Sequence, residues 1–537
     1  MLTTKSHWLI WPMVVVFGLP LAALLWQLFQ PDLEVWHHLS ETVLGGYIRQ
    51  SLSLLLWVTV GSALVGVSSA WLIARHRFSG QRVFQWLLIL PMAMPAYIVA
   101  YAYTWWLDVA GPVQSTLRTY NNWSFGDYVF PNIRSFGGAV LVLTLVLYPY
   151  VYLLARAAFQ RQSKQLFEAH QLAGGRHYFR QVALPLARPA IFGGLALVMM
   201  ETLADYGTVQ YFGLNTLTTG ILKTWFGLGS LAGAAQIASL LLSLVMVIML
   251  LEKYVRGTAG YAIDKGPQQG PPSITLSGWK NWMASLWCGL VVALGFVLPL
   301  CLLLVMAFHS RIYDWWSDFI NLIIHTLSVA GLGAVLTVAL ALLLLFVHRH
   351  TRSSRTQFAI RAMGLGYAVP GLVIAVGVTM AFGWLDQGLN GIISTFSAAP
   401  PTLLFSGGFL ALITAYVIRF LAVAMQPVEA AYQTINKNLD EASLLTGKNT
   451  NQTFRFVHLP LLKPSLWTAV LLVFVDLLKE LPATLVLRPF NFNTLAVKAY
   501  ELAADERLAD AAVPALCIVA VGLIPVIILN NKINHRL

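Results

Sequence analysis

The fold of this chain is decided by two similar stretches, FEAHQLAGGRHYFRQVALPLARPAI at residues 167–191 and DEASLLTGKNTNQTFRFVHLPLLKPSL at residues 440–466. Each contains Glu-Ala, a glycine six residues after the glutamate, a basic and aromatic segment, and then Leu-Pro. Internal repetition on this scale is the sequence signature of a duplicated architecture. The two stretches therefore predict a chain built from two related halves.

At the Leu-Pro ends of these stretches and on both sides of them, the duplication has a constant offset of 275 residues. The pairs are Pro95 with Pro370, Leu184 with Leu459, Pro185 with Pro460, Leu186 with Leu461, Arg188 with Lys463, Pro189 with Pro464, Glu201 with Asp476, and Asp205 with Glu480. We predict a first domain at 1–255 and a second at 283–537. Residues 256–282, which include GPQQGPPS, are expected to form a polar cytoplasmic linker between them.

The composition indicates a membrane protein, because 58% of the residues are hydrophobic and only 10% are charged. Apolar stretches of about 20 residues, long enough to cross a hydrocarbon core of about 30 Å, occur about twelve times. They lie at 8–30, 50–74, 84–107, 137–155, 187–208, 233–252, 284–307, 326–347, 361–385, 403–424, 465–485 and 509–530. The predicted fold class is an all-α polytopic membrane protein with two six-helix repeats. Six is an even number of spans, so the two repeats are parallel.

The formal net charge of +12 is explained by orientation in the membrane. If the N-terminus is inside, the great majority of the lysines and arginines fall in inner loops, which satisfies the positive-inside rule. We therefore expect a multi-pass protein of the bacterial inner membrane, surrounded by lipid, with both termini in the cytoplasm. The same distribution argues against a nucleic-acid partner.

The sequence offers no strong metal-binding pattern. Three cysteines lie in predicted spans without a Cys-x-x-Cys pair: Cys288, Cys301 and Cys517. They are expected to be buried structural thiols. His348 and His350 flank Arg349 in a basic loop, which disfavours a cation. We expect this chain to bind no cofactor and to hold no tightly bound metal.

Each copy of the repeated motif lies in a loop between the fourth and fifth spans of its half. The pattern predicts a short helix with an acid near its positive dipole end, which stops at Gly174 or Gly447. Pro185 and Pro460 then open the next membrane helix, where a missing N–H costs nothing. Such a helix is too short to span the bilayer and too charged to enter it, so it is available to a cytoplasmic partner.

This motif resembles the Glu-Ala-Ala coupling motif of type I ABC importer permeases, and the resemblance covers nearly the whole chain. In that family the loop forms a coupling helix, which sits in a cleft of the ATPase subunit and transmits nucleotide-driven closure to the membrane helices. The resemblance implies a permease subunit whose cytoplasmic ABC ATPase partners dock on two loops, so two copies are expected. It assigns the coupling contacts to Glu168, Ala169, Gly174, Glu441, Ala442 and Gly447, with Pro185 and Pro460 behind them.

Two departures from the family motif predict that the two docking surfaces differ. His170 and Ser443 replace the third alanine. The first loop places eleven residues between Gly174 and Pro185, whereas the second keeps the family's usual spacing of thirteen from Gly447 to Pro460. We therefore expect the first, shortened loop to make contacts of its own.

The chain is not expected to be an enzyme. Gly447-Lys448 superficially resembles the end of a Walker A loop, but Ala442 stands where that loop needs glycine. Asn449 stands where serine or threonine would bind magnesium. ATP and magnesium are therefore expected to be used by the separate ATPase subunits.

Two further stretches resemble iron(III) permeases that depend on a ferric-binding protein. They are ETLADYGTVQYFG at 201–213 and DLLKELPATLVLRPFNFNTLAVKAYELA at 476–503. The resemblance implies a periplasmic ferric-binding protein as a second partner and iron(III) as the cargo. A fused permease for thiamine, a polyamine or another small solute is the alternative within this class. Two rivals come from other classes. An ion-coupled secondary transporter would need no docking loops, and a non-transporting membrane scaffold would have no use for paired acids in its spans.

Four acids in the fifth spans form a candidate cation path or gate: Glu201, Asp205, Asp476 and Glu480. The members of each pair are four residues apart, so on a continuous helix they would share one face. Ionisable groups in spans usually face a bundle interior or a water-filled path, and oxygen ligands suit a hard trivalent cation. Ion pairing or gating is the competing interpretation. Tyr206 and Tyr211 also offer oxygens, although an interfacial aromatic belt accounts for them as well.

Overall fold

The computed structural model describes residues 7–30, 32–256, 273–311, 316–350, 353–396 and 400–534. Most of the predicted linker falls on residues 257–272 and so lies outside the described residues. The α-helices are α2 (His7–Gln27), α3 (Leu33–Thr42), α4 (Leu44–Arg75), α5 (Gln81–Leu87), α6 (Ala96–Leu107), α7 (Pro112–Asn121), α8 (Phe136–Gln160), α9 (Lys164–Leu172), α10 (Leu184–Ala204), α11 (Gly207–Tyr211), α12 (Leu217–Leu222), α13 (Leu231–Arg256), α14 (Trp279–Val292), α15 (Leu298–Phe308), α16 (Trp316–His350), α17 (Ser354–Met363), α18 (Gly371–Phe396), α19 (Phe409–Thr434), α20 (Lys437–Leu445), α21 (Thr450–Thr453), α22 (Leu459–Leu478), α23 (Pro482–Leu487), α24 (Leu495–Ala504) and α25 (Leu508–Asn534).

Short segments of other geometry connect these helices. Two are 3-10 helices, η1 (Leu90–Ala93) and η6 (Gly364–Ala368). Wider π-helical turns are η2 (Phe179–Ala183), η3 (Lys223–Gly227), η4 (Ala293–Val297) and η7 (Phe454–His458). Two-residue strands β1 (His76–Arg77) and β2 (Ile274–Thr275) pair in parallel. The predicted all-helical membrane architecture is confirmed, since eleven helices in the described residues are long and apolar enough to span a membrane.

The described chain forms two compact units. Unit 1 comprises Met1–Leu39, Gly220–Leu242 and Tyr313–Lys498, and unit 2 comprises Ser40–Thr219, Ser243–Ile312 and Ala499–Leu537. Each unit holds the central helices of one sequence repeat together with terminal helices of the other. In unit 1, for example, α2 packs against α18, and in unit 2 α15 packs against α6. The division at 1–255 and 283–537 describes the repeat in the sequence and stays a prediction.

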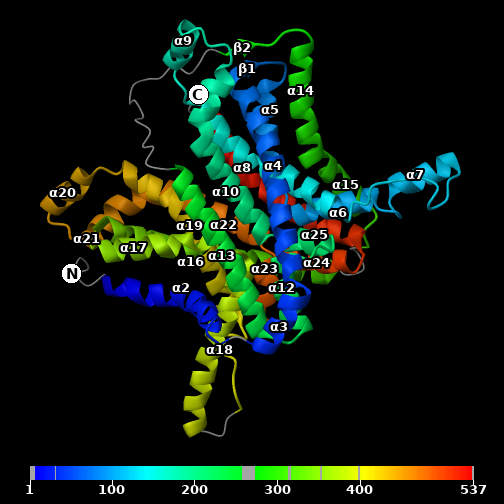
Figure 1. Ribbon diagram of the computed structural model, residues 1–537. Coiled ribbons are helices and arrows are strands. Elements are labelled where there is room, and N and C mark those ends of the chain that lie inside the picture. The colour runs from blue at the N-terminus through cyan, green and yellow to red at the C-terminus, as the bar shows by residue number, and fades with distance from the viewer. Residues whose placement is uncertain are drawn as a thin grey trace. The chain divides into compact units, whose positions relative to one another are not determined.

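Each unit has a core of three packed helices in corresponding positions. In unit 2, α4, α8 and α10 pack against one another (Figure 1). In unit 1 the same places are taken by α16, α19 and α22 (Figure 1). Glycines permit the close approach in unit 2, because a Cβ added at Gly66 or Gly194 would lie 2.8 Å from an atom of Val151 on α8. The repeat in the sequence therefore corresponds to a three-helix core that occurs once in each unit.

The predicted third span, residues 84–107, is divided into two helices in the structure. The helices at Gln81–Ala93 and Ala96–Asn121 meet at a bend of 93°. Pro95 causes the break, because a residue before proline avoids helical geometry and Met94 is extended, with φ −110° and ψ 118°. In the second repeat, Val369 is likewise extended (φ −78°, ψ 125°) between η6 and Pro370. The break is therefore a property of both repeats.

Neighbouring glycines on α10 provide a test of this packing. We expect Gly194→Ala to destabilise unit 2 by about 1–3 kcal/mol, because its new Cβ would press on the backbone of α8. Gly193→Ala is the control, since its Cβ would meet its nearest atom at 3.8 Å. The control is expected to be neutral or to stabilise by up to about 1 kcal/mol. Thermal unfolding of the purified chain in detergent measures both, and equal midpoints would contradict the close contact.

Candidate functional site

The repeated motif forms a short helix in each repeat, α9 in the first and α20 in the second. Both span nine residues and both begin at a side-chain cap. The Ser163 hydroxyl accepts a hydrogen bond from the Leu166 N–H, and the Asn436 side chain accepts one from the Asn438 N–H. Such caps satisfy backbone donors that a helix start leaves unpaired. The predicted short helices are present, with Glu168 and Glu441 both exposed on them.

Both helices end in the same way, at a glycine with left-handed backbone geometry. The φ angles of Gly174 and Gly447 are +72° and +82°. The Gly174 N–H donates to the Gln171 carbonyl at 3.0 Å, and the Gly175 N–H donates to the His170 carbonyl at 3.0 Å. Gly447 and Lys448 donate in the same pattern to Leu444 and Ser443. This pair of bonds is a Schellman motif, and its left-handed position explains the glycine in each copy.

Each helix presents exposed leucines that the sequence reasoning missed. Leu172 of α9 is 90% exposed and Leu445 of α20 is 89% exposed. One turn and a half earlier, Leu166 and Leu439 are each 44% exposed. Because the same exposed leucines recur in both copies, we regard them as a candidate interaction surface on each helix. The signal was available in the sequence, because both pairs are separated by the same 273 residues as the two glutamates.

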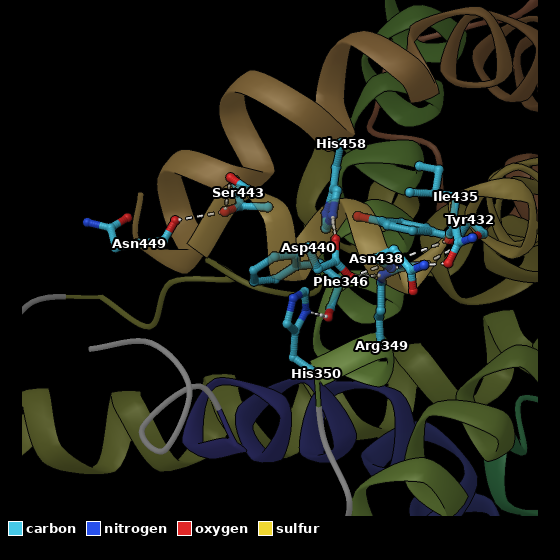
Figure 2. Close-up of polar contacts among 12 residues, drawn as sticks. Phe346, Arg349, His350, Tyr432, Ile435, Asn438, Asp440, Ser443, Asn449 and His458 are labelled. Atoms are coloured by element: carbon cyan, nitrogen blue, oxygen red, sulfur yellow. Dashed lines mark hydrogen bonds and ion pairs between the residues drawn. The ribbon is translucent and has the colours of Figure 1, made fainter. Parts of the chain in front are cut away.

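Within unit 1, a charged cluster holds α20 against its neighbouring helices, as Figure 2 shows. Arg349, at the end of α16, donates two hydrogen bonds to the Asp440 carboxylate, at 2.8 and 3.0 Å. It also donates to the backbone carbonyls of Tyr432 and Ile435, each at 3.0 Å. His458 Nε2 lies 2.5 Å from the other Asp440 oxygen. Asp440 therefore ties α20 to the end of α16 and to η7.

The surroundings of Asp440 favour its charged form. Burial opposes ionisation, but the hydrogen bonds from His458 and Arg349 outweigh it and hold the pKa of Asp440 below its usual value. Arg349 and Asp440 are both largely shielded, with side-chain exposures of 12% and 21%. Two charge-assisted hydrogen bonds to one carboxylate oxygen, together with the shielding, make such a pair stronger than an exposed surface ion pair. The cluster is therefore a candidate transmission point between α20 and α16.

The first repeat anchors α9 with aromatic contacts. Phe167 occupies the position that corresponds to Asp440, and the guanidinium of Arg75, at the end of α4, lies 4.2 Å from its ring centroid. The same guanidinium lies 5.3 Å from the Tyr178 ring. Phe167 and Tyr178 meet edge to face at 5.1 Å. Both repeats thus place an arginine from the second span beneath the motif helix, but one uses an ion pair and the other cation–π contacts.

The two residues that replace the third alanine also have different surroundings. Ser443 is buried, and its hydroxyl lies 2.8 Å from that of Thr453. The His170 ring meets Tyr178 at 5.5 Å. The two extra residues of the second loop form part of α21, which Asn449 and Gln452 start with a reciprocal capping box. The difference in length therefore reflects one added helical turn.

Pro185 and Pro460 are the second residues of the α-helices α10 and α22. The membrane spans themselves begin earlier, at Phe179 and at Thr450. The π-helical turns η2 and η7 lead directly into these helices. A proline ring inside a helix clashes with the carbonyl four residues earlier, and a wider turn relieves that crowding. The helix consequently continues from the motif loop into the span without a gap.

In each pair of acids the second member lies just beyond the end of its helix, at a break in the span. Helix α10 ends at Ala204, and Asp205 is extended, with ψ 127°. Its carboxylate accepts the N–H groups of Thr208 and Val209 at 3.0 and 3.1 Å. Helix α22 likewise ends at Leu478, before Glu480. The second acid of each pair therefore sits at a helix break.

Glu480 repeats the capping arrangement of Asp205. Its carboxylate accepts the N–H groups of Ala483 and Thr484, each at 3.0 Å, and the Thr484 hydroxyl at 2.7 Å. Arg419 lies 3.2 Å from the same carboxylate, whose side chain is 1% exposed. These bonds satisfy the first donors of α23, as those of Asp205 do for α11. They support a structural or gating role for this acid.

The first acids of the two pairs lie before the breaks. Asp476 pairs with Lys479 at 2.8 Å, and both side chains are partly exposed. Glu201 is on the last turn of α10 and is half-buried. Within the part of the chain that the structure describes, no three or more His, Cys, Asp or Glu residues are grouped so that they could hold a metal. A role of these four acids in a cation path stays a prediction.

The three cysteines are only partly as expected. Cys288 is buried, Cys517 is intermediate and Cys301 is exposed. The prediction of a buried thiol is wrong for Cys301, because that face of α15 points away from the packed core. Apolar residues on a membrane helix can face lipid as well as protein, so hydrophobicity alone did not distinguish the two.

The sequence of this chain is similar to those of known transport proteins. Residues 62–257 match the family described as binding-protein-dependent transport system inner membrane component. The chain is 26% identical over 490 residues to an Fe(3+)-transport system permease protein, FbpB 2, of Haemophilus influenzae, which covers 90% of this chain and 89% of that protein. By these matches the chain is similar to inner-membrane components of binding-protein-dependent transport systems. Such a component is a transport subunit and not a catalyst.

Two other relatives are permease proteins of a ferric and of a sulfate transport system. This chain is 26% identical over 486 residues to the ferric transport system permease protein FbpB of Actinobacillus pleuropneumoniae, which covers 83% of this chain and 65% of that protein. It is 24% identical over 208 residues to the sulfate transport system permease protein CysT of Salmonella typhimurium. That match covers 37% of this chain but 71% of CysT. The long matches thus run through both sequence repeats.

The Asp440 anchor of this chain predicts a local effect on α20. We expect Asp440→Asn to weaken the protection of α20 backbone amides by about 1.5–3 kcal/mol, because it leaves shielded Arg349 without its charged partner. Hydrogen exchange of the purified chain measures this protection. Glu441→Gln, which removes a charge from the next, exposed position, is the control and should leave exchange unchanged. Equal exchange in both variants would contradict the anchoring role.

The same anchor predicts a dependence on pH. Because the pKa of Asp440 is lowered in the folded chain, its contribution is fully present above the ordinary aspartate pKa of 3.8. It is lost as the pH falls through the lowered folded value. The difference in α20 protection between the wild type and Asp440→Asn should therefore persist at mildly acidic pH and shrink only below about pH 4. A difference that vanished between pH 7 and pH 5 would show that Asp440 does not carry the effect.

Proposed function

We propose that this chain imports iron(III) across the bacterial inner membrane, driven by ATP that separate ABC ATPase subunits hydrolyse. The observation that carries the proposal is the long match to two ferric transport permeases, which extends over 83–90% of this chain. A periplasmic ferric-binding protein delivers the cargo in this scheme. Both termini lie in the cytoplasm, as the distribution of lysine and arginine favours.

The ATPase subunits dock on α9 and α20, one copy on each. Both helices carry an exposed glutamate and an exposed leucine near the C-terminal end. Each helix also contacts an arginine at the end of a membrane-spanning helix. A partner that covers the tip can therefore pull on α4 through Arg75 and on α16 through Arg349. Glu168, Ala169 and Gly174, with Glu441, Ala442 and Gly447, form the docking surfaces. Pro185 and Pro460 mark where each loop passes its movement into the next span.

ATP binding closes the partner subunits and shifts both motif helices, and hydrolysis resets them. This is a two-state element whose equilibrium is biased by nucleotide. The chain itself needs no cofactor in this cycle, because magnesium and ATP stay with the partner. The helix breaks capped by Asp205 and Glu480 act as gates on the path, since a broken span can reorient more easily than a continuous helix.

A substitution at the tip of α20 tests the docking surface. We expect Leu445→Asp to weaken ATPase docking about 10-fold or more, because a buried leucine contributes about 1.5–3 kcal/mol and the new carboxylate resists burial. ATPase pull-down and stimulated hydrolysis in proteoliposomes measure the loss. Gln433→Glu, an equal change of charge at an exposed position of α19, is the matched control. Normal docking of the Leu445 variant would remove α20 from the interface.

Uptake assays test the cargo. In this assay the full chain and its ATPase are placed in proteoliposomes with the ATPase facing the lumen, and the binding protein and radioactive iron(III) are added outside. Iron(III) should accumulate in the lumen only when the lumen contains ATP. Thiamine and a polyamine serve as the competing cargoes. ATP-dependent uptake of either one with no uptake of iron would establish the alternative, and uptake driven by an ion gradient alone would exclude the importer mechanism.

A further inference from the structure

Five tyrosines gather around the helix break that follows α10 in unit 2. Tyr206 precedes α11 and Tyr211 ends it, Tyr97 and Tyr101 lie on α6, and Tyr500 lies on α24. The hydroxyls of Tyr206 and Tyr500 are 3.2 Å apart. The rings of Tyr101 and Tyr211 meet edge to face at 4.7 Å, and those of Tyr97 and Tyr101 lie at 5.7 Å. We call these five residues the tyrosine cluster.

The tyrosine cluster is not an interfacial aromatic belt. Belt residues face the lipid surface, whereas Tyr97, Tyr101 and Tyr206 are only 5%, 1% and 6% exposed. The Tyr101 hydroxyl is buried and finds no hydrogen-bond partner among the described residues. A buried hydroxyl without a partner costs free energy that phenylalanine would avoid. Packing therefore accounts for the rings but not for this hydroxyl.

The second repeat shows that the helix break can form without tyrosines. It keeps the break after the fifth span, the capping acid Glu480 and the short helix α23. At the positions that correspond to Tyr97, Tyr101, Tyr206 and Tyr211 it has Leu372, Val376, Leu481 and Val486. Aliphatic side chains are thus sufficient to build the break. Four of the five phenolic oxygens therefore belong to the first repeat alone, whereas Tyr500 comes from the second repeat, and these four need a reason other than folding.

The charges around the tyrosine cluster favour a cation. Asp205 directly precedes Tyr206 in the chain. Arg134 lies 5.2 Å from the Tyr211 ring, but it is paired with Asp108 at 3.0 Å and with Glu506 at 2.7 Å. The surroundings of the cluster therefore hold one guanidinium, paired with two of the three carboxylates. Because Asp205 already caps α11 with both oxygens, it supplies charge, while the phenols supply the ligand atoms.

The spacing of the hydroxyls suits a small, hard ion. Adjacent oxygens on an octahedral cation with bonds of about 2.0–2.1 Å lie about 2.9 Å apart. The Tyr206 and Tyr500 hydroxyls share a hydrogen bond of 3.2 Å, so their oxygens already lie close to that separation. Phenolate oxygen is a ligand that proteins use for iron, and hard cations prefer oxygen to nitrogen or sulfur.

We propose that the tyrosine cluster is a transient binding station for the trivalent cation cargo, with Tyr206 and Tyr500 as adjacent ligands and Tyr101 as a third. This inference rests on the proposed import of iron(III). Each phenol that binds exchanges its hydroxyl proton for the cation and releases that proton to the water that accompanies the ion. The iron stays ferric throughout, so no electron donor is required. Rebinding of the protons frees the cation again, which keeps the station temporary.

Removal of single hydroxyls tests the station without disturbing the packing. Tyr101→Phe, Tyr500→Phe and the double variant keep every ring in place. The control is Tyr148→Phe, which removes a buried hydroxyl from α8 in the same unit, where it donates to the Leu88 carbonyl at 2.8 Å. Thermal unfolding confirms that all the variants fold. Iron(III) uptake should fall about 10-fold or more in the double variant, the loss typical of a removed metal contact, and stay near wild type in the control.

A spectroscopic readout distinguishes binding from a structural effect. Ferric nitrilotriacetate added to the full chain in nanodiscs with its ATPase should produce the visible charge-transfer absorption of iron(III)–phenolate. The band should be lost in the double variant and kept in Tyr148→Phe. Gallium(III), a redox-inert trivalent ion, should compete for the site. No band in the wild type, or a band that survives in the double variant, would overturn the station.

The outcomes also separate this inference from the proposed function. Wild-type iron uptake that the double variant matches would overturn the station and leave the import of iron(III) intact. ATP-dependent uptake of a different solute by the wild type, with no uptake of iron, would overturn both. Loss of iron uptake and of the absorption band together, with ATPase docking and unfolding temperature unchanged, would establish the tyrosine cluster as part of the path.

Discussion

The structure depends on one constraint: a backbone N–H inside a membrane must find a partner within the protein. Continuous helices meet this requirement by themselves, but a broken span leaves donors that only a side chain or a neighbouring segment can satisfy. The chain breaks its fifth span in both repeats and supplies a carboxylate at each break. Asp205 and Glu480 accept the free donors of α11 and α23, so the acids make the breaks possible. Any change of direction in these spans passes through them.

The breaks and the motif helices lie at opposite ends of the same spans, α10 and α22. At one end, η2 or η7 joins the span to its motif loop without an interruption. At the other end, the capping acid begins the short helix that follows. Movement of a motif helix is thereby connected along a single rigid element to a helix break. This continuity is the mechanical basis for treating the breaks as gates.

The two repeats keep the same geometry with different chemistry. Beneath the motif helix, an ion pair of Arg349 with Asp440 in one repeat corresponds to the stacking of Arg75 on Phe167 in the other. At the break, aliphatic residues in one repeat correspond to tyrosines in the other. A duplicated chain can specialise each copy in this way, because the backbone frame is maintained by glycine, proline and the capping acids. Positions that differ between the copies are therefore the places to look for function.

The sequence by itself determined the helical membrane class, the duplication, the two motif helices and their glycine ends. These features follow from hydropathy, spacing and backbone conformation, which are local properties of a chain. Only the tertiary structure decided that helix α10 stops before Asp205, that Arg349 meets Asp440 and that five tyrosines converge at one break. Each of these depends on side chains brought together from distant segments. Local patterns do not encode such contacts, because packing between helices selects which face of each helix meets which neighbour.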